Sequence, residues 1–366
     1  MGSVPARCVR ATVTSGSARL VVQTWLGTRL VILLVAFYLA VVEGRALPDM
    51  FDNWDVSHFL AIAEQGYIGT DVAFFPGWPL LLRLVSLTGL PAWLGGVLLA
   101  LVASGLAAWA LYRLGGPPAA IAWLLAPTAI FTVVPYTESL FCAAAFWAWD
   151  RALAKQWWPA AALAAVAASV RVSGVFLILA LAVLAWNQGG RRWPRLAWLL
   201  VPTAVVVGYA SYLWQLTGSW TAWYDAQATG WARGLTWPWV SFQHTLDAAA
   251  PGSYANYPEW SWMFRVELVA MVIGLVVTIY ALAKRRWAEG AWVGVQVAAF
   301  SISYWFMSVP RAMLLWFPLW IDLGRGLAGR TKPRPWRAAM LGALAVVALA
   351  LQAVWAWLFF SGRWAG

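Results

Sequence analysis

Two carboxylates and an imidazole recur every three residues in an aromatic stretch that follows the first apolar segment. On an α-helix, Asp52, Asp55 and His58 would share one face. Carboxylates and an imidazole held close together can supply a general base near neutral pH. Trp54 beside Asp55 indicates that this helix lies where a membrane begins, because tryptophan favours the interface. We therefore predict an outer juxtamembrane helix that carries acid–base chemistry.

Simpler interpretations of the same residues stay open at this point. An acidic residue in a loop is most often a solvated charge, and that holds for Asp52 or Asp55 taken alone. The three side chains could also hold a metal ion, but spacing alone does not define a metal site. The chain's other histidine, His244, is far away in the sequence. We predict no metal and no cofactor.

The composition shows what must position this face. The chain has 366 residues, of which 63% are hydrophobic and 11% charged, whereas soluble domains have about a quarter charged residues. Apolar segments of membrane-spanning length recur along almost the whole sequence. A water-soluble fold is therefore excluded, and we predict one all-α, polytopic membrane domain over 1–366. The 30 tryptophans fit the membrane interface, although GC-rich codons also favour this residue. That composition, with a short N-terminus, favours a bacterial plasma membrane.

We predict about eleven transmembrane helices, counted from a cytoplasmic N-terminus. The segment 73–90 is expected to be a short amphipathic or re-entrant piece, because a full span there would scramble the charge distribution that follows. The predicted spans are 26–43, 91–113, 118–135, 139–154, 157–170, 172–187, 195–215, 263–283, 290–308, 312–325 and 337–360.

This layout separates basic from acidic residues, as the positive-inside rule requires. Most carboxylates then fall outside, in and around two long loops, 44–72 and 216–262. The net charge of +11 is therefore explained by membrane topology, and we expect no nucleic-acid partner. The predicted inner basic residues are Arg113, Arg151, Lys155, Arg191, Arg192, Arg195, Lys284, Arg285, Arg286, Arg325, Arg330, Lys332, Arg334 and Arg337.

Two further predictions concern the cysteines and the first apolar span. Cys8 lies in the basic N-terminal tail and Cys142 in an apolar span, so we predict no disulfide between them. The first apolar span has the basic flank of a signal peptide. Because many spans follow it, we predict an uncleaved first helix.

Four elements of the sequence stand out by their residues and order. They are Trp54-Asp55-x-x-His58-Phe59-x-x-Ile62-Ala63-x-x-Gly66-Tyr67 with Ala73-Phe74-Phe75-Pro76-x-x-Pro79-Leu80, then Tyr136-Thr137-Glu138-Ser139-Leu140-Phe141, then Ser169-Val170-Arg171-Val172-Ser173-Gly174, and Arg311 to Phe317-Pro318. The first three, all in the first half of the chain, resemble motifs of the PIG-V family, the GPI mannosyltransferase II type, and its bacterial relatives. The fourth is only loosely similar, because Ala312 stands where the family has tyrosine.

The resemblance implies a GT-C glycosyltransferase fold and a defined reaction. Mannose would pass from a polyprenyl-phosphate-mannose donor to a lipid-linked or glycan acceptor outside the cytoplasm, with inversion and without a metal. The family's catalytic aspartate falls on Asp55, with Asp52 and His58 as further catalytic candidates. Membrane lipid would surround the chain.

Charge must also be stabilised on the departing phosphate, and arginine suits this through its fork of donors. Arg171 and Arg311, predicted at the outer ends of spans, are our candidates; a structural pair of Arg171 with Glu138 is an equal alternative. Arg265 and Glu267 are expected to form an interfacial anchor pair. Further substrate-site candidates, all within the motifs, are Trp54, Tyr67, Tyr136 and Glu138.

Three rival functions remain. The same fold could use another polyprenyl-phosphate sugar, such as glucose or arabinose, since nothing in the sequence reads the sugar hydroxyls. A lipid or solute transporter would place charges in the middle of spans and show repeat symmetry, whereas these carboxylates fall in outer loops. A non-catalytic subunit would not need the intact motif around Asp55.

Overall fold

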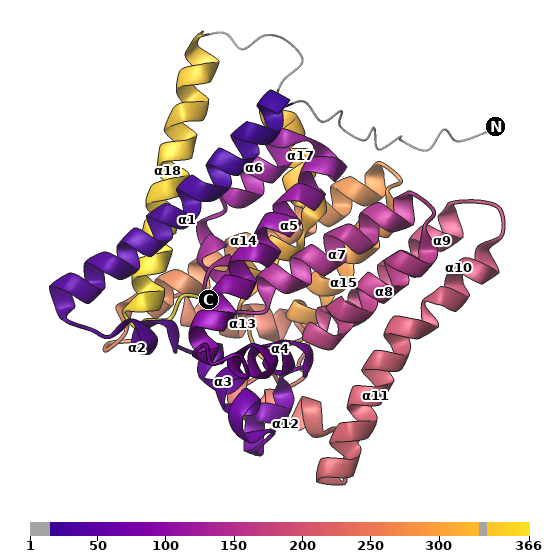
Figure 1. The fold of residues 1–366 in the computed structure, drawn as a ribbon, viewed down its shortest axis with the longest axis horizontal. Coiled ribbons are helices and arrows are strands. Elements are labelled where there is room, and N and C mark those ends of the chain that lie inside the picture. The colour runs from indigo at the N-terminus through magenta and orange to yellow at the C-terminus, as the bar shows by residue number, and fades with distance from the viewer. Residues whose placement is uncertain (1–14, 329–334) are drawn as a thin grey trace.

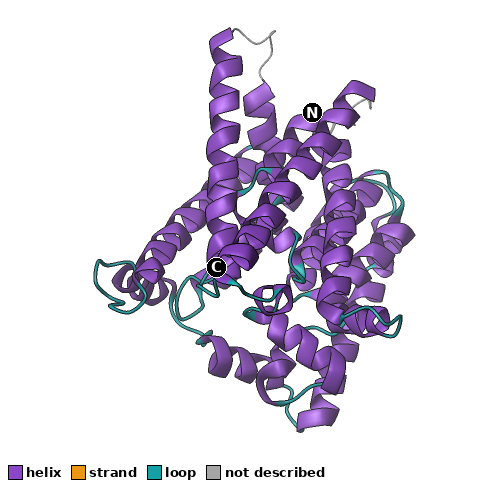
Figure 2. Cartoon of the chain, turned by 60° about the vertical axis from the view of Figure 1, so that its left-hand side comes forward, coloured by secondary structure: helices purple, strands orange, loops and turns teal. Residues whose placement is uncertain are grey.

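The computed structural model describes residues 15–328 and 335–366. Helices form nearly all of its regular structure, and Figure 2 shows no strand in the described chain. An isolated antiparallel bridge joins Leu235 to Ser303. The predicted all-α class is confirmed. The predictions for Cys8, Arg330, Lys332 and Arg334 lie outside the described residues.

Five helices of the described chain are long and apolar enough to cross a membrane. Each turns leucine and valine side chains outward, as helices do when lipid replaces water around them. The chain is therefore an integral membrane protein. The five are α1 (Ser15–Glu43), α5 (Ala92–Gly115), the continuous pair α10 (Arg192–Trp198) and α11 (Leu200–Thr217), α14 (Pro258–Ala283) and α18 (Pro335–Phe360).

Shorter helices fill the space between these five (Figure 1). The close contact of α5, α7 and α8 uses alanine, a small residue that lets helix backbones approach in a membrane. The count of eleven full spans is not confirmed. The shorter helices are α6 (Pro117–Leu124), α7 (Glu138–Leu153), α8 (Trp157–Val170), α9 (Ser173–Asn187), α15 (Trp287–Ser301), α16 (Val309–Ala312) and α17 (Phe317–Ala328).

The predicted continuous span 118–135 is wrong. Helix α6 ends at Leu124, and the 3₁₀ turn η2 (Pro127–Thr132) follows, because a proline inside a helix removes a donor and clashes with the preceding turn. The freed carbonyls find side-chain partners: Gln352 of α18, fully buried, donates to the carbonyls of Leu124 and Ala126 at 2.7 and 2.9 Å. Such broken helices are tolerated in a membrane only where protein surrounds them.

A second break separates α15 from α17. The predicted spans 290–308 and 312–325 are displaced, because α15 ends at Ser301 and the chain then continues as a loop, α16 and the 3₁₀ turn η3 (Met313–Leu315) before α17 begins. Trp123 of α6 donates to the carbonyl of Leu314 at 2.9 Å, and so covers this break. Both irregular segments lie beside the cavity described below.

The short helices of the two long loops gather at one end of the molecule, the lower end in Figure 1. The prediction of a short piece at 73–90 is confirmed, since the 3₁₀ turn η1 (Gly69–Ala73) leads into the ten-residue α4. Trp223 and Gln227 of α12 both donate to the carbonyl of Ala73, at 3.0 and 3.1 Å, and so join the two loops. The loop helices are α2 (Leu47–Phe51), α3 (Asp55–Gln65), α4 (Gly77–Ser86), α12 (Ala222–Trp231) and α13 (Pro238–Ala248).

Candidate active site

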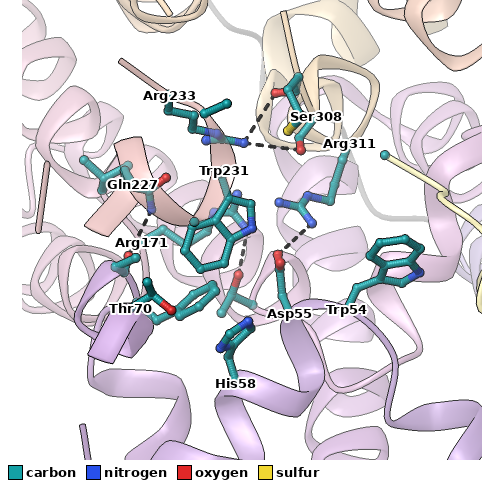
Figure 3. Close-up of a pocket in the computed structure, with 18 of the residues that line it drawn as sticks. Trp54, Asp55, His58, Thr70, Arg171, Gln227, Trp231, Arg233, Ser308 and Arg311 are labelled. Atoms are coloured by element: carbon teal, nitrogen blue, oxygen red, sulfur yellow. Dashed lines mark hydrogen bonds and ion pairs between the residues drawn. The ribbon is translucent and has the colours of Figure 1, made fainter. Parts of the chain in front are cut away.

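A cavity of about 660 Å³ opens where the two loops meet the ends of α8 and α16. Figure 3 shows polar and aromatic side chains from these elements converging on it. The residues that the following argument uses are Asp55 and His58 from α3, Arg171 after α8, Trp231 and Arg233 at the end of α12, and Arg311 from α16.

Asp55 is the first residue of α3 and is held from two sides. Its backbone N–H donates to the Tyr136 hydroxyl at 3.2 Å, and its Oδ2 accepts a hydrogen bond from Nη1 of Arg311 at 2.9 Å. The side chain is 16% exposed, and its Oδ1 has no hydrogen-bond partner among the described residues. A carboxylate fixed at one oxygen and open at the other can accept a proton from a bound hydroxyl group.

Asp52 does not share this face, so that prediction is wrong. Asp52 caps the end of α2, is exposed and does not line the cavity. The helix is interrupted because Nδ2 of Asn53 donates to the carbonyls of Met50 and Phe359, at 2.8 and 3.0 Å. Trp54 then takes a positive φ of 60°, which turns α3 away from α2.

His58 lies one turn after Asp55 on α3 and lines the cavity, as its spacing predicts. Its partner is Asp71 of η1: Nδ1 of His58 and Oδ1 of Asp71 are 2.7 Å apart. Trp231 packs against the imidazole ring at a centroid distance of 5.3 Å. A carboxylate on Nδ1 orients the ring and leaves Nε2 as the atom for a ligand.

Glu138 connects the two predicted arginines. It starts α7, is fully buried, and its Oε1 pairs with Nη1 of Arg171 at 2.5 Å and with Nε of Arg311 at 3.0 Å. Arg311 in turn pairs with Asp55, so four alternating charges form the chain Asp55–Arg311–Glu138–Arg171. Burial lowers the pKa of Arg311, but the carboxylates of Asp55 and Glu138 outweigh this and raise its pKa above the ordinary value.

Two glycines explain how Arg171 reaches this position. The residue caps α8 in an extended conformation, and its Nη1 also donates to Oγ1 of Thr137 at 2.6 Å. A β-carbon on Gly174 would lie 2.3 Å from Cα of Ala168, and one on Gly77 would lie 2.8 Å from the carbonyl oxygen of Ser169. Only glycine permits such close approaches, so the tight turn around Arg171 requires both.

Glu267 holds the loop that carries Arg311. It is 1% exposed on α14, and its two carboxylate oxygens accept the backbone N–H groups of Ser308 and Val309 at 2.7 and 2.8 Å. The predicted anchor pair of Arg265 with Glu267 is not formed, because Nε of Arg265 donates to the carbonyl of Ala249 at 2.9 Å. Glu267 is thus a support for the site.

Sequence reasoning missed Arg233. It follows α12, where Ala232 takes a positive φ of 50°, and its guanidinium contacts only the neutral oxygens of Met307 and Ser308, at 3.5 and 3.4 Å. No carboxylate pairs with it in the part of the chain that the structure describes. Burial lowers the pKa of Arg233 to about 10, so it stays charged at neutral pH. The signal that could have identified it in the sequence is that it is a single arginine in an aromatic outer loop.

The other predicted substrate-site residues divide into two groups. Tyr136 and Trp54 line the cavity, whereas the buried Glu138 lies behind the arginines that face it. Tyr67 does not line the cavity. Its hydroxyl donates to the carbonyl of Phe74 at 3.0 Å and so shapes the loop segment that carries Asp71.

The described residues thus define a polytopic helical membrane protein with a cavity at one end, lined by a carboxylate and three arginines. The structure is similar to the crystal structure of ArnT from Cupriavidus metallidurans bound to undecaprenyl phosphate. The TM-score is 0.53 at 16% sequence identity, and the match covers 95% of this chain and 70% of that chain. The likeness shows a shared fold, that of the GT-C class.

Sequence comparison finds relatives named GPI alpha-1,6-mannosyltransferase 2. The mouse protein is 35% identical over 154 residues, and the human protein is 37% identical over 155 residues. Each match covers 37% of this chain and 31% of the relative, so the chain matches about a third of the length of these curated proteins. No protein-family model matches the chain. The predicted resemblance is confirmed at this level: about a third of the chain is similar in sequence to these PIG-V-type proteins, and its fold is that of the GT-C class.

Proposed function

We propose that this chain is a glycosyltransferase that moves mannose from a polyprenyl-phosphate-mannose donor to a lipid-linked acceptor on the non-cytoplasmic side. The observation that carries the proposal is the meeting of Asp55 with Arg171, Arg233 and Arg311 at one cavity. The reaction needs a base for a hydroxyl group and cations for a phosphate leaving group, and this cavity offers both. The likeness to mannosyltransferases and to a protein that binds undecaprenyl phosphate supports it.

In this mechanism Asp55 is the general base. The acceptor hydroxyl gives its proton to Oδ1 of Asp55, the atom that has no hydrogen-bond partner among the described residues. The acceptor oxygen then bonds to the anomeric carbon on the face opposite the phosphate, and the bond from that carbon to the phosphate oxygen breaks. The sugar inverts, and the electron pair leaves with the polyprenyl phosphate. Arg311 holds Asp55 in place before the reaction through its hydrogen bond to Oδ2.

The three arginines contribute differently to binding the phosphate. Arg171 and Arg311 already share Glu138, so part of their charge is compensated inside the protein. Arg233 pairs with no carboxylate within the described residues, so its guanidinium can donate to a new anion. We therefore add Arg233 to the phosphate-binding set. His58, oriented by Asp71, contributes Nε2 to a substrate hydroxyl.

Product analysis tests the reaction. Membranes that contain the chain are supplied with polyprenyl-phosphate-mannose labelled in the sugar, and with matched glucose and arabinose donors. We expect label from mannose in an extractable glycolipid, and none from membranes lacking the chain. Transfer of label from another sugar donor would change the donor assignment but would keep the proposed type of reaction. If no donor transfers label, the proposed function is wrong, and the alternative that the chain is a transporter is favoured.

Cysteine labelling tests the side on which the cavity opens. Helix α14 runs from the cavity end to the opposite end, so the residues just before and after it report the two sides. In a chain whose own two cysteines are replaced by serine, Ser253→Cys should react with an impermeant reagent in intact cells. Lys284→Cys should react only after lysis. The reverse pattern would place the cavity in the cytoplasm.

A further inference from the structure

A second cavity, of about 740 Å³, lies away from the candidate active site. It opens between the end of α7, the start of α8 and α10. Helix α8 links the two cavities, because Trp157 at its start lines the second and Arg171 after its last residue lines the first. Its 14 residues separate them by about 20 Å at 1.5 Å per residue. The proposed reaction uses no residue of this second cavity.

Among the described residues, four cations and no carboxylate line the second cavity. Of these, Arg151 is compensated, because its Nε donates to the carboxylate of Asp150 at 2.9 Å. Arg195 donates to the carbonyl of Gly189 at 2.7 Å, a neutral partner. Lys155 and Arg191 are exposed, and neither forms an ion pair within residues 15–328 and 335–366. The cavity therefore carries excess positive charge that no described residue balances.

The surroundings of the second cavity are apolar. Trp158 and Trp198 line it and are exposed by 64% and 46%, as tryptophans at a membrane interface are. Beyond them α11 exposes Leu200 and Val201, and α8 exposes Val166. A ligand with a charged oxygen-rich head and a hydrocarbon tail would contact both parts. A soluble phosphate would contact only the first.

We propose that the second cavity binds the headgroup of an anionic phospholipid, with Lys155 and Arg191 contacting the phosphate and the acyl chains lying along α8 and α11. Clusters of basic residues at the membrane surface attract anionic lipids through their charge. The flanking tryptophans and the exposed apolar side chains of α8 and α11 distinguish this cavity from a general basic surface. The proposal does not depend on the proposed transferase reaction.

Native mass spectrometry of the detergent-purified full chain tests this site. The wild-type chain should retain phosphatidylglycerol in preference to phosphatidylcholine. The double variant Lys155→Gln/Arg191→Gln should bind phosphatidylglycerol about tenfold more weakly or worse, because two cations at the headgroup are lost. The matched control is Lys284→Gln/Arg285→Gln, after α14, which removes the same charge outside the cavity. Lys155 and Arg285 both have positive φ, 61° and 56°, so the backbone cost is alike.

The control should retain the lipid like the wild type. Equal losses in both double variants would mean general electrostatic attraction and would overturn the site. Unchanged retention in Lys155→Gln/Arg191→Gln would overturn it as well. Competition by inorganic phosphate as effective as by the lipid would replace the lipid with a soluble anion.

Discussion

The two cavities use arginine in opposite ways. At the candidate active site, Arg311 and Arg171 are each paired with carboxylates, whereas in the second cavity three of the four lining cations pair with no carboxylate of the described residues. Paired charges fix the position of a side chain before a substrate arrives, as catalysis requires. Unpaired charges on an exposed surface leave the side chains mobile and available for a ligand of variable shape. The difference predicts where substitution affects folding, where it affects reaction, and where it affects neither.

The largest effect is expected at Glu138. Glu138→Gln would leave the guanidinium groups of Arg171 and Arg311 buried together without their shared anion. Breaking a buried pair in this way costs about 3–5 kcal/mol of stability. Melting temperature in detergent measures it. In a double-mutant cycle, Arg171→Gln/Glu138→Gln should recover part of the loss. Additive losses in the double variant would contradict coupling between the two residues.

The next effect concerns Asp55, where loss of reaction should exceed loss of stability. Asp55→Asn keeps the size of the side chain but removes its basicity, so turnover should fall about 10²-fold or more. Arg311 retains Glu138 as its partner, so the melting temperature should change little. Asp52→Asn is the control, because Asp52 is exposed and outside the cavity lining. Near-normal turnover of purified Asp55→Asn protein would refute the assignment of the base.

A smaller effect is expected at Arg233, which lacks a carboxylate partner although it lines the active-site cavity. Arg233→Gln should raise the Michaelis constant for the donor about tenfold, the scale of a hydrogen bond to a charged group, with little loss of stability. Arg233→Lys should recover only part, because lysine lacks the fork. Arg83→Gln, on the exposed surface of α4, is the control. An unchanged Michaelis constant in Arg233→Gln would assign the phosphate to Arg171 and Arg311 alone.

The smallest effect is expected for the folding contribution of the second cavity. Lys155→Gln/Arg191→Gln should change the stability of lipid-free protein by less than about 1 kcal/mol, because exposed charges contribute little. Thermal unfolding without added lipid measures this. A loss of stability as large as that of Glu138→Gln would mean that the cations of both cavities contribute to folding in the same way, and it would contradict the difference drawn between them.

Much of the site was predictable residue by residue. Asp55, Arg171, Glu138 and Arg311 stand in motifs that resemble a known family. Three of them line one cavity with Tyr136, and the fourth, Glu138, pairs with two of the three from behind. The failures have local causes. Asp52 was placed on the wrong element because the side chain of Asn53 ends the helix there. Arg233 was missed because neither spacing nor charge pattern distinguishes an arginine in a loop.

The sequence by itself determined the class of this protein. Its apolar segments must satisfy every backbone group internally in lipid, so they form helices, and its motifs indicate the family. The tertiary structure alone decided which charges meet. Arg311 pairs with Asp55 across 256 residues, and that pairing depends on where α6 and α15 break and how Gln352, Trp123 and Glu267 cover the breaks. Local patterns specify helices, but contacts between distant segments follow from packing, which no single segment encodes.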